Sequence, residues 1–323
     1  MKKIGVFTSG GDAPGMNACI RAVVRTAIHN GLEVVGIMEG YQGILDKKFV
    51  PMVAHSVSNI IQQGGTILKS ARCTEFRTKK GRKQAYENLK EAGIDGVVAI
   101  GGDGTFTGAS VFMEEHPDIP FVGCPGTIDN DLHGTDFTIG YDTAINTAME
   151  AIDKIKDTAN ADARLFFIEV MGRDVGFIAL RSGIATGAET VLMPETSTSI
   201  KELVKTIEAH YQRKKASIII IVAEGEEMGG AVKVAKKVSK KFTALPSRVT
   251  ILGHIQRGGS PTAMERVNAS WMGLEAVKAL IAGKKGIMIG IVNNKVTHTP
   301  FGKAIKHNQE ISPTLLEMIK VLA

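Results

Sequence analysis

The stretch Gly96-Val97-Val98-Ala99-Ile100-Gly101-Gly102-Asp103-Gly104-Thr105, with the helical segment 106–115 after it, decides the expected fold. An apolar run, a glycine-rich turn and a helix follow one another here, and the same order recurs over 4–30. Strands that alternate with helices imply right-handed βαβ units and mostly parallel sheets. Because the strands are apolar throughout, we expect helices on both faces of each sheet. The sequence therefore predicts an α/β fold, with ligands bound beyond the carboxyl ends of the strands.

The same pattern, read along the chain, predicts the remaining elements. We expect helices over 16–30, 57–63, 79–92, 106–115, 142–158, 175–185, 200–214, 231–242, 261–282 and 314–322. We expect strands over 4–8, 33–38, 96–100, 119–123, 165–171, 217–223, 249–253 and 287–292, and a loop or hairpin over 40–51.

Composition narrows the class of protein. The 323 residues suffice for one or two domains. The sequence contains no run of 18 apolar residues, so we expect no membrane span. The net charge is +6, but the basic residues are scattered without interleaved aromatics, so we expect anionic small molecules rather than nucleic acid as partners. Cys19, Cys73 and Cys124 lie far apart, in no metal-ligand spacing. The apolar run 4–8 near the N-terminus is too short for a signal h-region, so we expect a cytoplasmic protein.

The stretch from Gly123 to Asp131 carries a hydroxyl and two carboxylates directly after an apolar run. Its Pro125-Gly126 step is expected to break regular structure. In an extended segment residues two apart point the same way, so Asp129 and Asp131 would converge on one site. There they would divide the work of taking a proton and holding a metal ion. An acidic turn with no catalytic role is the alternative.

Two glycine-rich loops between a strand and a helix are suited to phosphate groups. Ser9–Gly15 would let backbone N–H groups approach a phosphate, although it matches neither the Walker A nor the GxGxxG spacing. In Gly101–Thr105, Asp103 would reach Mg²⁺ bound to phosphates. A GGDGT core recurs in ATP-using kinases of sugars, lipids and NAD, so it indicates a nucleotide phosphate more firmly than it indicates the acceptor. A structural turn is the alternative for both loops.

Basic residues follow two later strands. Arg173 would stabilise charge on a transferring phosphoryl group, and Arg257 and His254 would project from the glycine-rich loop 253–259 to hold a substrate phosphate. A surface arginine and a packed histidine are the alternatives. No Ser/His/Asp or Cys/His grouping indicates covalent catalysis, and no His/Cys cluster indicates zinc.

Five motifs together resemble the bacterial ATP-dependent 6-phosphofructokinases (the phosphofructokinase A family), in that family's order and spacing. They are Ser9–Gly15, Gly101–Gly104, Pro125–Asp131, Met171–Arg173 and Gly253–Gly259. The resemblance covers essentially the whole chain. It implies transfer of the γ-phosphoryl of MgATP to the 1-hydroxyl of fructose 6-phosphate, the committed step of glycolysis, with Mg²⁺ as cofactor and a homotetramer as the assembly.

The resemblance also implies the architecture. We expect two Rossmann-like three-layer α/β/α domains with mostly parallel sheets and the active site in the cleft between them. The larger, ATP-binding domain would contain residues 1–138 plus about 251–300. The smaller, fructose 6-phosphate-binding domain would contain residues 139–250 plus about 301–323.

Site residues are assigned by the same resemblance. The ATP site would contain Gly11, Tyr41, Arg72, Cys73, Gly102, Asp103, Gly104 and Thr105, with magnesium at Asp103 and Asp131. The catalytic residues would be Asp129 as the base, with Thr127, Arg173, Arg72 and Gly11. The sugar-phosphate site would contain Thr127, Asp129, Met171, Gly172, Arg173, Glu224, His254 and Arg257, with Arg164 and Arg248 supplied across a subunit interface. Thr105 replaces the family's usual Ser or Asn and keeps a side chain that can hydrogen-bond.

Two glycines bear on the phosphate donor. Pyrophosphate-dependent relatives carry Asp where this chain has Gly104 and Lys where it has Gly126. Those larger side chains would fill the space that the α-phosphate of ATP needs, so the sequence favours ATP.

Regulation is predicted from a further set of matches. The family's effector pocket for ADP or phosphoenolpyruvate corresponds to Arg21, Arg25, Ser58, Asn59, Lys156, Glu189, Arg213 and Lys215. Ala54, however, stands where the family usually has Arg, and Ser217 where many members have His. One lost Arg–phosphate contact costs on the order of 1–3 kcal/mol. We therefore expect an effector site that persists but is weakened or retuned.

Two other interpretations remain open at the level of sequence. One is another GGDGT-type kinase acting on NAD or a lipid, which the motifs at 125–131 and 253–259 argue against. The other is a non-catalytic nucleotide-sensing subunit, which the full set of candidate catalytic residues argues against. Rates, cooperativity and effector choice do not follow from the sequence.

Overall fold

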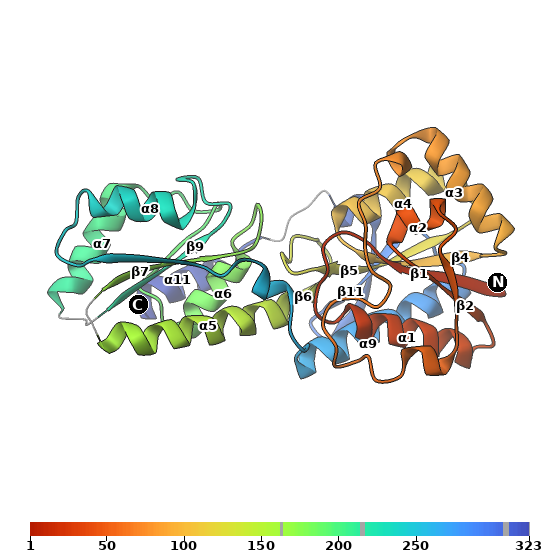
Figure 1. The fold of residues 1–323 in the computed structure, drawn as a ribbon, viewed down its shortest axis with the longest axis horizontal. Coiled ribbons are helices and arrows are strands. Elements are labelled where there is room, and N and C mark those ends of the chain that lie inside the picture. Colours follow the sequence, from red (N-terminus) through yellow and green to blue (C-terminus); the bar gives the residue numbers. More distant parts are fainter. Residues whose placement is uncertain (162–163, 214–216, 306–309, 323) are drawn as a thin grey trace. The chain divides into compact units, whose positions relative to one another are not determined.

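The computed structural model describes residues 1–161, 164–213, 217–305 and 310–322, which form two compact units (Figure 1). Unit 1 contains Met1–Thr143 and Arg257–Gln309, and unit 2 contains Ala144–Gln256 and Glu310–Ala323. Each unit is thus built from two separate segments of the chain. Among the described residues, no helix is both long enough and apolar enough to cross a membrane.

Unit 1 is built on one large sheet. Its described strands are β1 (Lys3–Thr8), β2 (Glu33–Ile37), β3 (Phe49–Met52), β4 (Gly96–Gly101), β5 (Phe121–Thr127), β6 (Ile139–Gly140), β11 (Ile287–Val292) and β12 (Lys295–Pro300). They run in the order β12-β11-β5-β4-β1-β2-β3, and β6 pairs with the end of β5. The strands from β11 to β2 are parallel, whereas the edge strands β3 and β12 are antiparallel to their neighbours. The carboxyl ends of β1, β4 and β5 therefore lie side by side.

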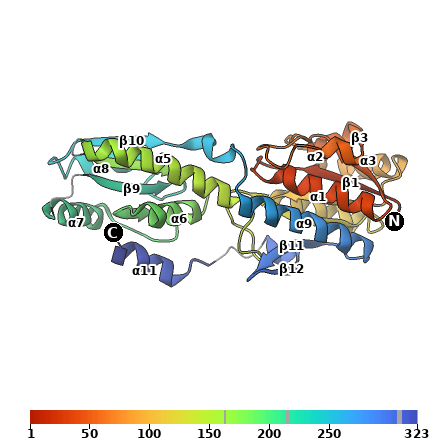
Figure 2. The same cartoon turned by 90° about the horizontal axis from the view of Figure 1, so that it is seen from below.

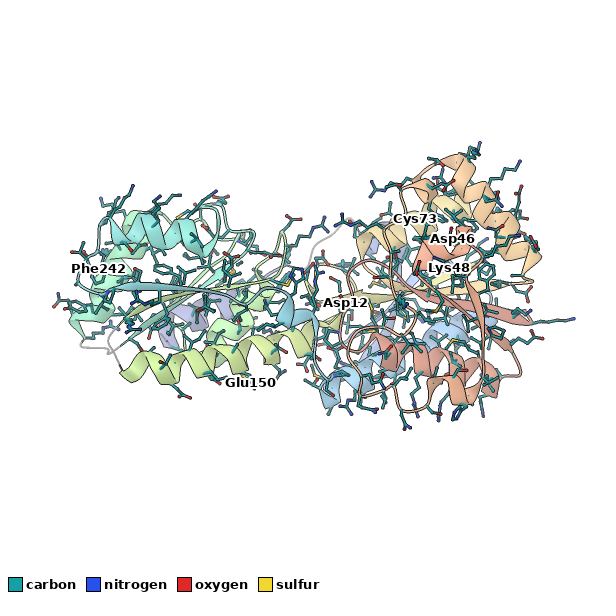
Figure 3. The ribbon with its side chains drawn as sticks, in the orientation of Figure 1. Asp12, Asp46, Lys48, Cys73, Glu150 and Phe242 are labelled. Carbon is teal, nitrogen blue, oxygen red and sulfur yellow. The ribbon has the colours of Figure 1, made fainter. Side chains whose placement is uncertain are left out.

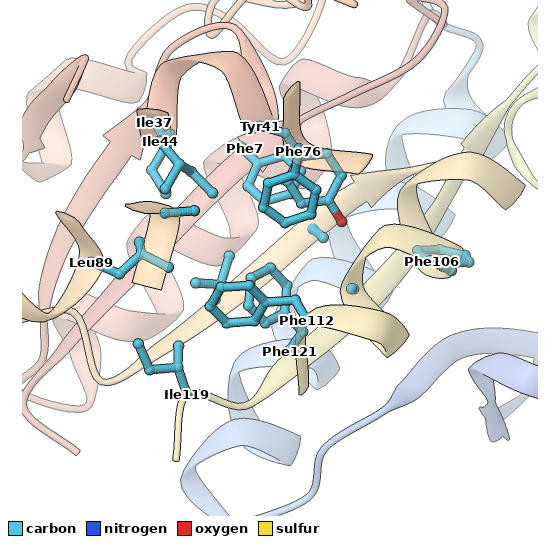
Figure 4. Close-up of a cluster of buried hydrophobic side chains, with 14 of the residues drawn as sticks. Phe7, Ile37, Tyr41, Ile44, Phe76, Leu89, Phe106, Phe112, Ile119 and Phe121 are labelled. Atoms are coloured by element: carbon cyan, nitrogen blue, oxygen red, sulfur yellow. The ribbon is translucent and has the colours of Figure 1, made fainter. Parts of the chain in front are cut away.

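Helices cover both faces of this sheet. They are α1 (Met16–His29), α2 (Gly40–Leu45), α3 (Lys79–Glu91), α4 (Asp103–Glu115), α9 (Ala263–Ile281) and α10 (Phe301–Ala304), with short 3-10 helices η1 (Ala54–Val57) and η2 (Glu75–Arg77). α1 and α9 pack together on one face, and α2, α3 and α4 lie on the other (Figures 1 and 2). Between the sheet and α2–α4, buried aromatic side chains such as Phe7, Phe112 and Phe121 form a continuous core (Figure 4).

Unit 2 has a smaller sheet in which all described strands are parallel. Its elements are α5 (Tyr141–Ala161), β7 (Leu165–Val170), α6 (Phe177–Thr186), β8 (Thr190–Leu192), α7 (Ile200–Gln212), β9 (Ile218–Ala223), α8 (Gly230–Ser239), β10 (Ser247–Ile251), η3 (Gly253–Arg257) and α11 (Pro313–Leu322). The strand order is β10-β7-β9-β8. The strands pack against α7 and α8 in a core that includes Phe242 (labelled in Figure 3), and α6 and α11 lie on the opposite face (Figure 2). The predicted class, α/β with mostly parallel sheets between helices, is confirmed.

Several predicted elements differ from the structure. The helix predicted over 57–63 does not form: Val57 ends the 3-10 helix η1, and the chain then turns, with Asn59 in a left-handed conformation at φ 57°. The expected loop over 40–51 contains α2 and β3. The Pro125-Gly126 step does not break β5, because the pairing of β11 with β5 ends at Gly123 and leaves no ladder bond there for Pro125 to donate. The edge strands β8 and β12 were not predicted.

Candidate active site

Three of the predicted motifs meet at the carboxyl ends of β1, β4 and β5 in unit 1. The amide of Ser9 donates to the carbonyl of Ile100 at 2.9 Å, which ties the first glycine-rich loop to the end of β4. A Cβ on Gly101 would lie 2.6 Å from the Ser9 carbonyl oxygen, so the loop backbone passes directly over this glycine. A Cβ on Gly102 would lie 3.8 Å from the Cβ of Thr127. Both glycine-rich loops and Thr127 are therefore neighbours.

Two helices begin at this cluster. Gly15 is the N-cap of α1, and Gly102 is the N-cap of α4, which starts at Asp103 rather than at the predicted Phe106. The first N–H groups of a helix have no partner within it, and they carry the positive end of the helix dipole. A Cβ at Gly10 or Gly104 would meet nothing within 4 Å, so this side of both loops is open. Such an arrangement suits the phosphates of a nucleotide.

Tyr41 supports the first turn of α4 from inside the protein. Its hydroxyl donates to the carbonyl of Thr105 at 2.5 Å, and its ring stacks on Phe76 with 3.9 Å between ring centroids. Burial raises the pKa of Tyr41, so the phenol stays neutral. Cys73, labelled in Figure 3, is half-buried just before η2, and burial raises the pKa of its thiol as well. The neighbouring Arg72 is exposed.

A tight turn follows Thr127. The Asp129 amide donates to the Thr127 hydroxyl at 3.2 Å, and the Thr138 hydroxyl donates to the Thr127 carbonyl at 2.6 Å. Asn130 is buried and left-handed at φ 56°, and its side chain donates to the Asp136 carbonyl at 3.1 Å and accepts from the Thr138 amide at 2.8 Å.

The turn changes the predicted directions of Asp129 and Asp131. The expectation that Asp129 and Asp131 share the direction of an extended segment is wrong, because the chain bends at 128–129 and reverses hand at Asn130. Both carboxylates are half-buried. Asn130, which sequence reasoning did not single out, sets where they lie, and its position between two aspartates was the available signal.

Arg257 joins the same cluster although it comes much later in the chain. A Cβ on Gly11 would lie 3.5 Å from Cζ of the Arg257 guanidinium. Arg257 is half-buried and ends η3, and α9 follows and packs on α1. The guanidinium therefore adds a positive charge beside the first glycine-rich loop.

A second cluster lies at the carboxyl ends of β7 and β9 in unit 2. The amide of Arg173, which is left-handed at φ 54°, donates to the Glu224 carboxylate at 2.7 Å. The amide of Glu224 donates in turn to the Val170 carbonyl at 2.9 Å. Arg173 is exposed, and its Nε lies 3.4 Å from the Asp174 carboxylate, a surface pair that contributes little to stability. Met171, Gly172, Arg173 and Glu224 are thus brought together.

Gln256 organises the edge of this second cluster. It is fully buried, its Oε1 accepts from the Met171 amide at 3.2 Å, and its Nε2 donates to the Gly253 carbonyl at 3.0 Å. The amide side chain thereby fixes η3 against the end of β7, while His254 remains exposed. Sequence reasoning missed Gln256 even though it lies between His254 and Arg257 in a motif that was singled out.

Arg164 and Arg248 lie away from this cluster. Arg164 precedes β7, and Arg248 in β10 pairs with Phe166 near the start of β7. Met171 is five residues further along, about 17 Å at the rise of a parallel strand. Within one chain, therefore, the structure does not bring these two arginines to Arg173.

The residues matched to an effector pocket fall into two groups. In unit 1, Arg21 and Arg25 are one turn apart on α1, next to η1, and burial together with the charge of Arg25 lowers the pKa of Arg21. Ser58 and Asn59 follow η1.

In the unit 2 group, two side chains are already hydrogen-bonded to the protein backbone. Lys156 donates to the Thr186 carbonyl, and the buried Glu189 accepts from the Ile219 amide at 2.6 Å. Arg213 is exposed at the end of α7, and Lys215 lies outside the described residues.

Among the described residues, protein side chains alone do not form a metal cage. Over the part of the chain that the structure describes, no three His, Cys, Asp or Glu side chains gather in a way that could hold a metal ion. Mg²⁺ is commonly bound by one or two carboxylates together with substrate phosphates. Asp103, exposed in the first turn of α4, fits that mode.

Comparison with known proteins decides the family. Residues 3–280 match the family described as Phosphofructokinase. The chain belongs to the phosphofructokinase family.

Two curated phosphofructokinases match end to end. The chain is 52% identical to ATP-dependent 6-phosphofructokinase 2 of Bacteroides thetaiotaomicron over 323 residues, covering 100% of this chain and 99% of that one. It is 54% identical to ATP-dependent 6-phosphofructokinase 1 of Thermus thermophilus, covering 100% of both chains.

Solved structures of phosphofructokinases share the fold of this chain. Phosphofructokinase of Saccharomyces cerevisiae superposes with a TM-score of 0.90 at 39% identity, over 95% of this chain and 45% of the yeast chain. The chain therefore spans somewhat less than half of that longer protein. A pyrophosphate-dependent phosphofructokinase from Marinobacter aquaeolei superposes with a TM-score of 0.84 at 21% identity, over 97% of this chain and 86% of that one, which shows the fold alone.

Proposed function

We propose that the chain transfers the γ-phosphoryl of MgATP to the 1-hydroxyl of fructose 6-phosphate, giving fructose 1,6-bisphosphate and ADP. The observation that carries the proposal is the meeting of both glycine-rich loops with Thr127 and the turn that bears Asp129. The end-to-end relatives named ATP-dependent 6-phosphofructokinase support the choice of donor and acceptor.

The phosphates of ATP would lie over the loops of unit 1. The open sides of Gly10 and Gly104, the N-termini of α1 and α4, and the Arg257 guanidinium beside Gly11 supply space and positive charge. Gly11, Gly102 and Thr105 belong to these loops, and Tyr41, Arg72 and Cys73 would complete the ATP site. Mg²⁺ held by the phosphates with Asp103 and Asp131 would neutralise negative charge there.

Asp129 would act as the general base. A half-buried carboxylate in a turn fixed by Thr127, Asn130 and Thr138 is held in position to accept the proton of the acceptor hydroxyl. Phosphoryl transfer depends mainly on positioning and charge neutralisation, so Arg173 and Thr127 would stabilise the transferring group.

The sugar phosphate would be bound by residues of the second cluster. We assign this role to Met171, Gly172, Arg173, Glu224 and His254, with Arg257. Arg164 and Arg248, which stand near the start of β7, would serve a neighbouring subunit. The homotetramer that the family resemblance implies is proposed as the assembly.

We also propose an effector site formed by residues of both units. ADP or phosphoenolpyruvate would bind at Arg21, Arg25, Ser58, Asn59, Lys156, Glu189, Arg213 and Lys215. The site would be weakened or retuned, because Ala54 offers no guanidinium and Ser217 offers no imidazole. Ordinary activation by ADP and inhibition by phosphoenolpyruvate would contradict the weakened site.

Steady-state kinetics test the proposal directly. Purified protein is assayed with fructose 6-phosphate, NAD or a diacylglycerol as acceptor and with ATP or pyrophosphate as donor. We expect turnover with ATP and fructose 6-phosphate only. Phosphorylation of NAD or lipid instead, or ATP binding without turnover of any acceptor, would refute the assignment in favour of another GGDGT-type kinase or a nucleotide sensor.

A further inference from the structure

Glu265 is a buried carboxyl group that no step of the proposed reaction uses. It lies in the first turn of α9, yet its carboxylate serves the start of α5. Oε2 accepts from the Thr143 amide at 3.4 Å and from the Thr143 hydroxyl at 3.3 Å, and the carboxylate also accepts from the backbone N–H of Gly140. Glu265 therefore satisfies N–H groups at the beginning of a helix other than its own.

The first turns of α5 and α9 cap one another. The Thr262 hydroxyl oxygen accepts from the Glu265 amide at 3.1 Å, and the Thr262 amide donates to the Thr143 hydroxyl oxygen at 3.3 Å. The Thr262 hydroxyl donates to the Asp142 carboxylate. In an ordinary capping box the acidic residue would bond the N-cap amide of its own helix. Here the Glu265 carboxylate of α9 bonds Thr143 of α5, and the Thr262 amide of α9 also bonds Thr143. These bonds fix the first turns of the two helices to each other.

This junction touches both halves of the phosphate-binding cluster. Gly140 and Ile139 form β6, which pairs with Gly126 and Thr127 at the end of β5. On the other side, a Cβ on Gly15 would lie 2.9 Å from Cγ of Glu265, and Gly15 is left-handed at φ 105°, so only glycine suits this position. Glu265 thus contacts the last residue of the first glycine-rich loop and also fixes the strand beside Thr127.

We propose that Glu265 is a positioning residue for phosphoryl transfer, holding the Gly15 end of the first glycine-rich loop in register with Thr127 and the Asp129 turn. The inference rests on the proposed kinase function and deepens it. Displacing reacting groups by about 1 Å costs roughly 100-fold in rate, so a residue that sets this register affects kcat more than substrate binding.

The charge of Glu265 provides a readout that a purely structural residue would not move. Burial raises the pKa of Glu265 to about 8, the amides of Gly140 and Thr143 act in the opposite direction, and the Asp142 carboxylate raises it further. On α9 the Arg266 guanidinium is bonded to the Pro261 carbonyl at 2.8 Å and to Ser260 Oγ at 2.9 Å. The ionised carboxylate accepts these three hydrogen bonds more strongly than the neutral acid does, so kcat should rise as pH increases through 8.

The experiment compares Glu265→Gln with Glu275→Gln, the same substitution further along α9 at a residue paired with Lys278. Above pH 8, where wild-type Glu265 is ionised, we expect kcat to be roughly 10- to 100-fold lower in E265Q than in wild type, with both KM values changed less than about threefold. The rise of kcat near pH 8 should disappear in E265Q and persist in E275Q. Hydrogen exchange at the Gly140 and Thr143 amides should accelerate in E265Q alone.

Unchanged kcat and an unchanged pH profile in E265Q would overturn the proposal, as would a raised KM at constant kcat. If E265Q does not fold, Thr143→Val removes the hydroxyl between Glu265 and Thr262 and must show the same loss of kcat. If wild-type protein turns over no fructose 6-phosphate, the proposed function fails. Unaltered exchange at Gly140 and Thr143 in E265Q would then refute the positioning role separately.

Discussion

At the scale of single residues, the site depends on how the chain bends after β5. The strand does not by itself orient Asp129. Its direction is set by the turn that follows, in which Asn130 is left-handed and Thr138 makes two hydrogen bonds. Gly104 and Gly126 differ in the space that surrounds them. A side chain at 104 would enter open space, whereas a Cβ at 126 would lie 2.9 Å from Met16 Cε and 3.2 Å from the Gly101 amide nitrogen.

Asp129→Asn tests the base. The amide keeps the size of the side chain but cannot accept the proton, so we expect kcat to fall roughly 10²–10⁴-fold while KM for both substrates changes little. Asp153→Asn, at an exposed position of α5, is the matched control. Near-normal turnover in D129N would show that another group takes the proton.

Gly104→Asp tests the choice of donor. The new carboxylate would enter the open space at the start of α4 without a packing cost and would repel the phosphates of ATP. We expect kcat/KM for ATP to fall roughly 10- to 100-fold with little change in the midpoint of thermal unfolding, because like charges placed together cost a few kcal/mol. Gly302→Asp, in the first turn of α10 and also in open space, is the control. Equal use of ATP by G104D and wild type would place the phosphates elsewhere.

At the scale of elements, the first turns of helices form most of the candidate phosphate site. α4 begins three residues earlier than its apolar pattern suggests, so Asp103, Gly104 and Thr105 form its first turn and not a loop before it. α5 and α9 begin at one shared network centred on Glu265. These starts convert loop sequences into fixed arrays of N–H groups, which is why the candidate phosphate site is made largely of backbone.

The helix junction predicts how stability depends on pH. The pKa of Glu265 is about 8 in the folded chain against 4.5 for an ordinary glutamate, so the folded state binds a proton that the unfolded state releases. This contribution is full below pH 4.5 and is lost as pH rises through 8. In thermal melts between pH 6 and 9, the midpoint of wild type should therefore fall more than that of E265Q, whereas E275Q should follow wild type. Parallel curves for all three would show that Glu265 does not titrate in this range.

At the scale of the whole molecule, each unit carries its own set of the proposed site residues. Unit 1 has the glycine-rich loops, Asp129 and Arg257, and unit 2 has Met171, Arg173 and Glu224. Arg248 lies on β10, an edge strand of the unit 2 sheet, beside the exposed apolar side chains of Val249 and Ile251. An arginine on such an edge, about 17 Å along the sheet from the Arg173 end, is better placed for a second copy of the chain than for its own site.

Mixing two impaired variants tests this assignment, with activity measured at a fructose 6-phosphate concentration near the wild-type KM, where R248A is slow. Arg248→Ala should weaken fructose 6-phosphate binding roughly 10- to 100-fold, as expected for a lost charge-assisted contact. If Arg248 serves a neighbour, co-expression of R248A with D129N should create sites with both residues intact and restore about a quarter of wild-type activity. Activity no higher than that of the separate variants would place Arg248 in its own chain's site or outside any site.

The sequence by itself determined the α/β class, most strands and helices, and the five motifs, because apolar runs and glycine turns are local patterns. It failed where local preference was overridden: at Pro125, because β5 has no partner there on one side, and at Asn130, whose side chain takes its bonds from 136 and 138. Only the tertiary structure decided that Ser9 lies over Gly101, that Arg257 lies beside Gly11, and that Glu265 joins α5 to α9. Those contacts depend on the order in which distant strands pair and distant helices pack, which short stretches of sequence do not encode.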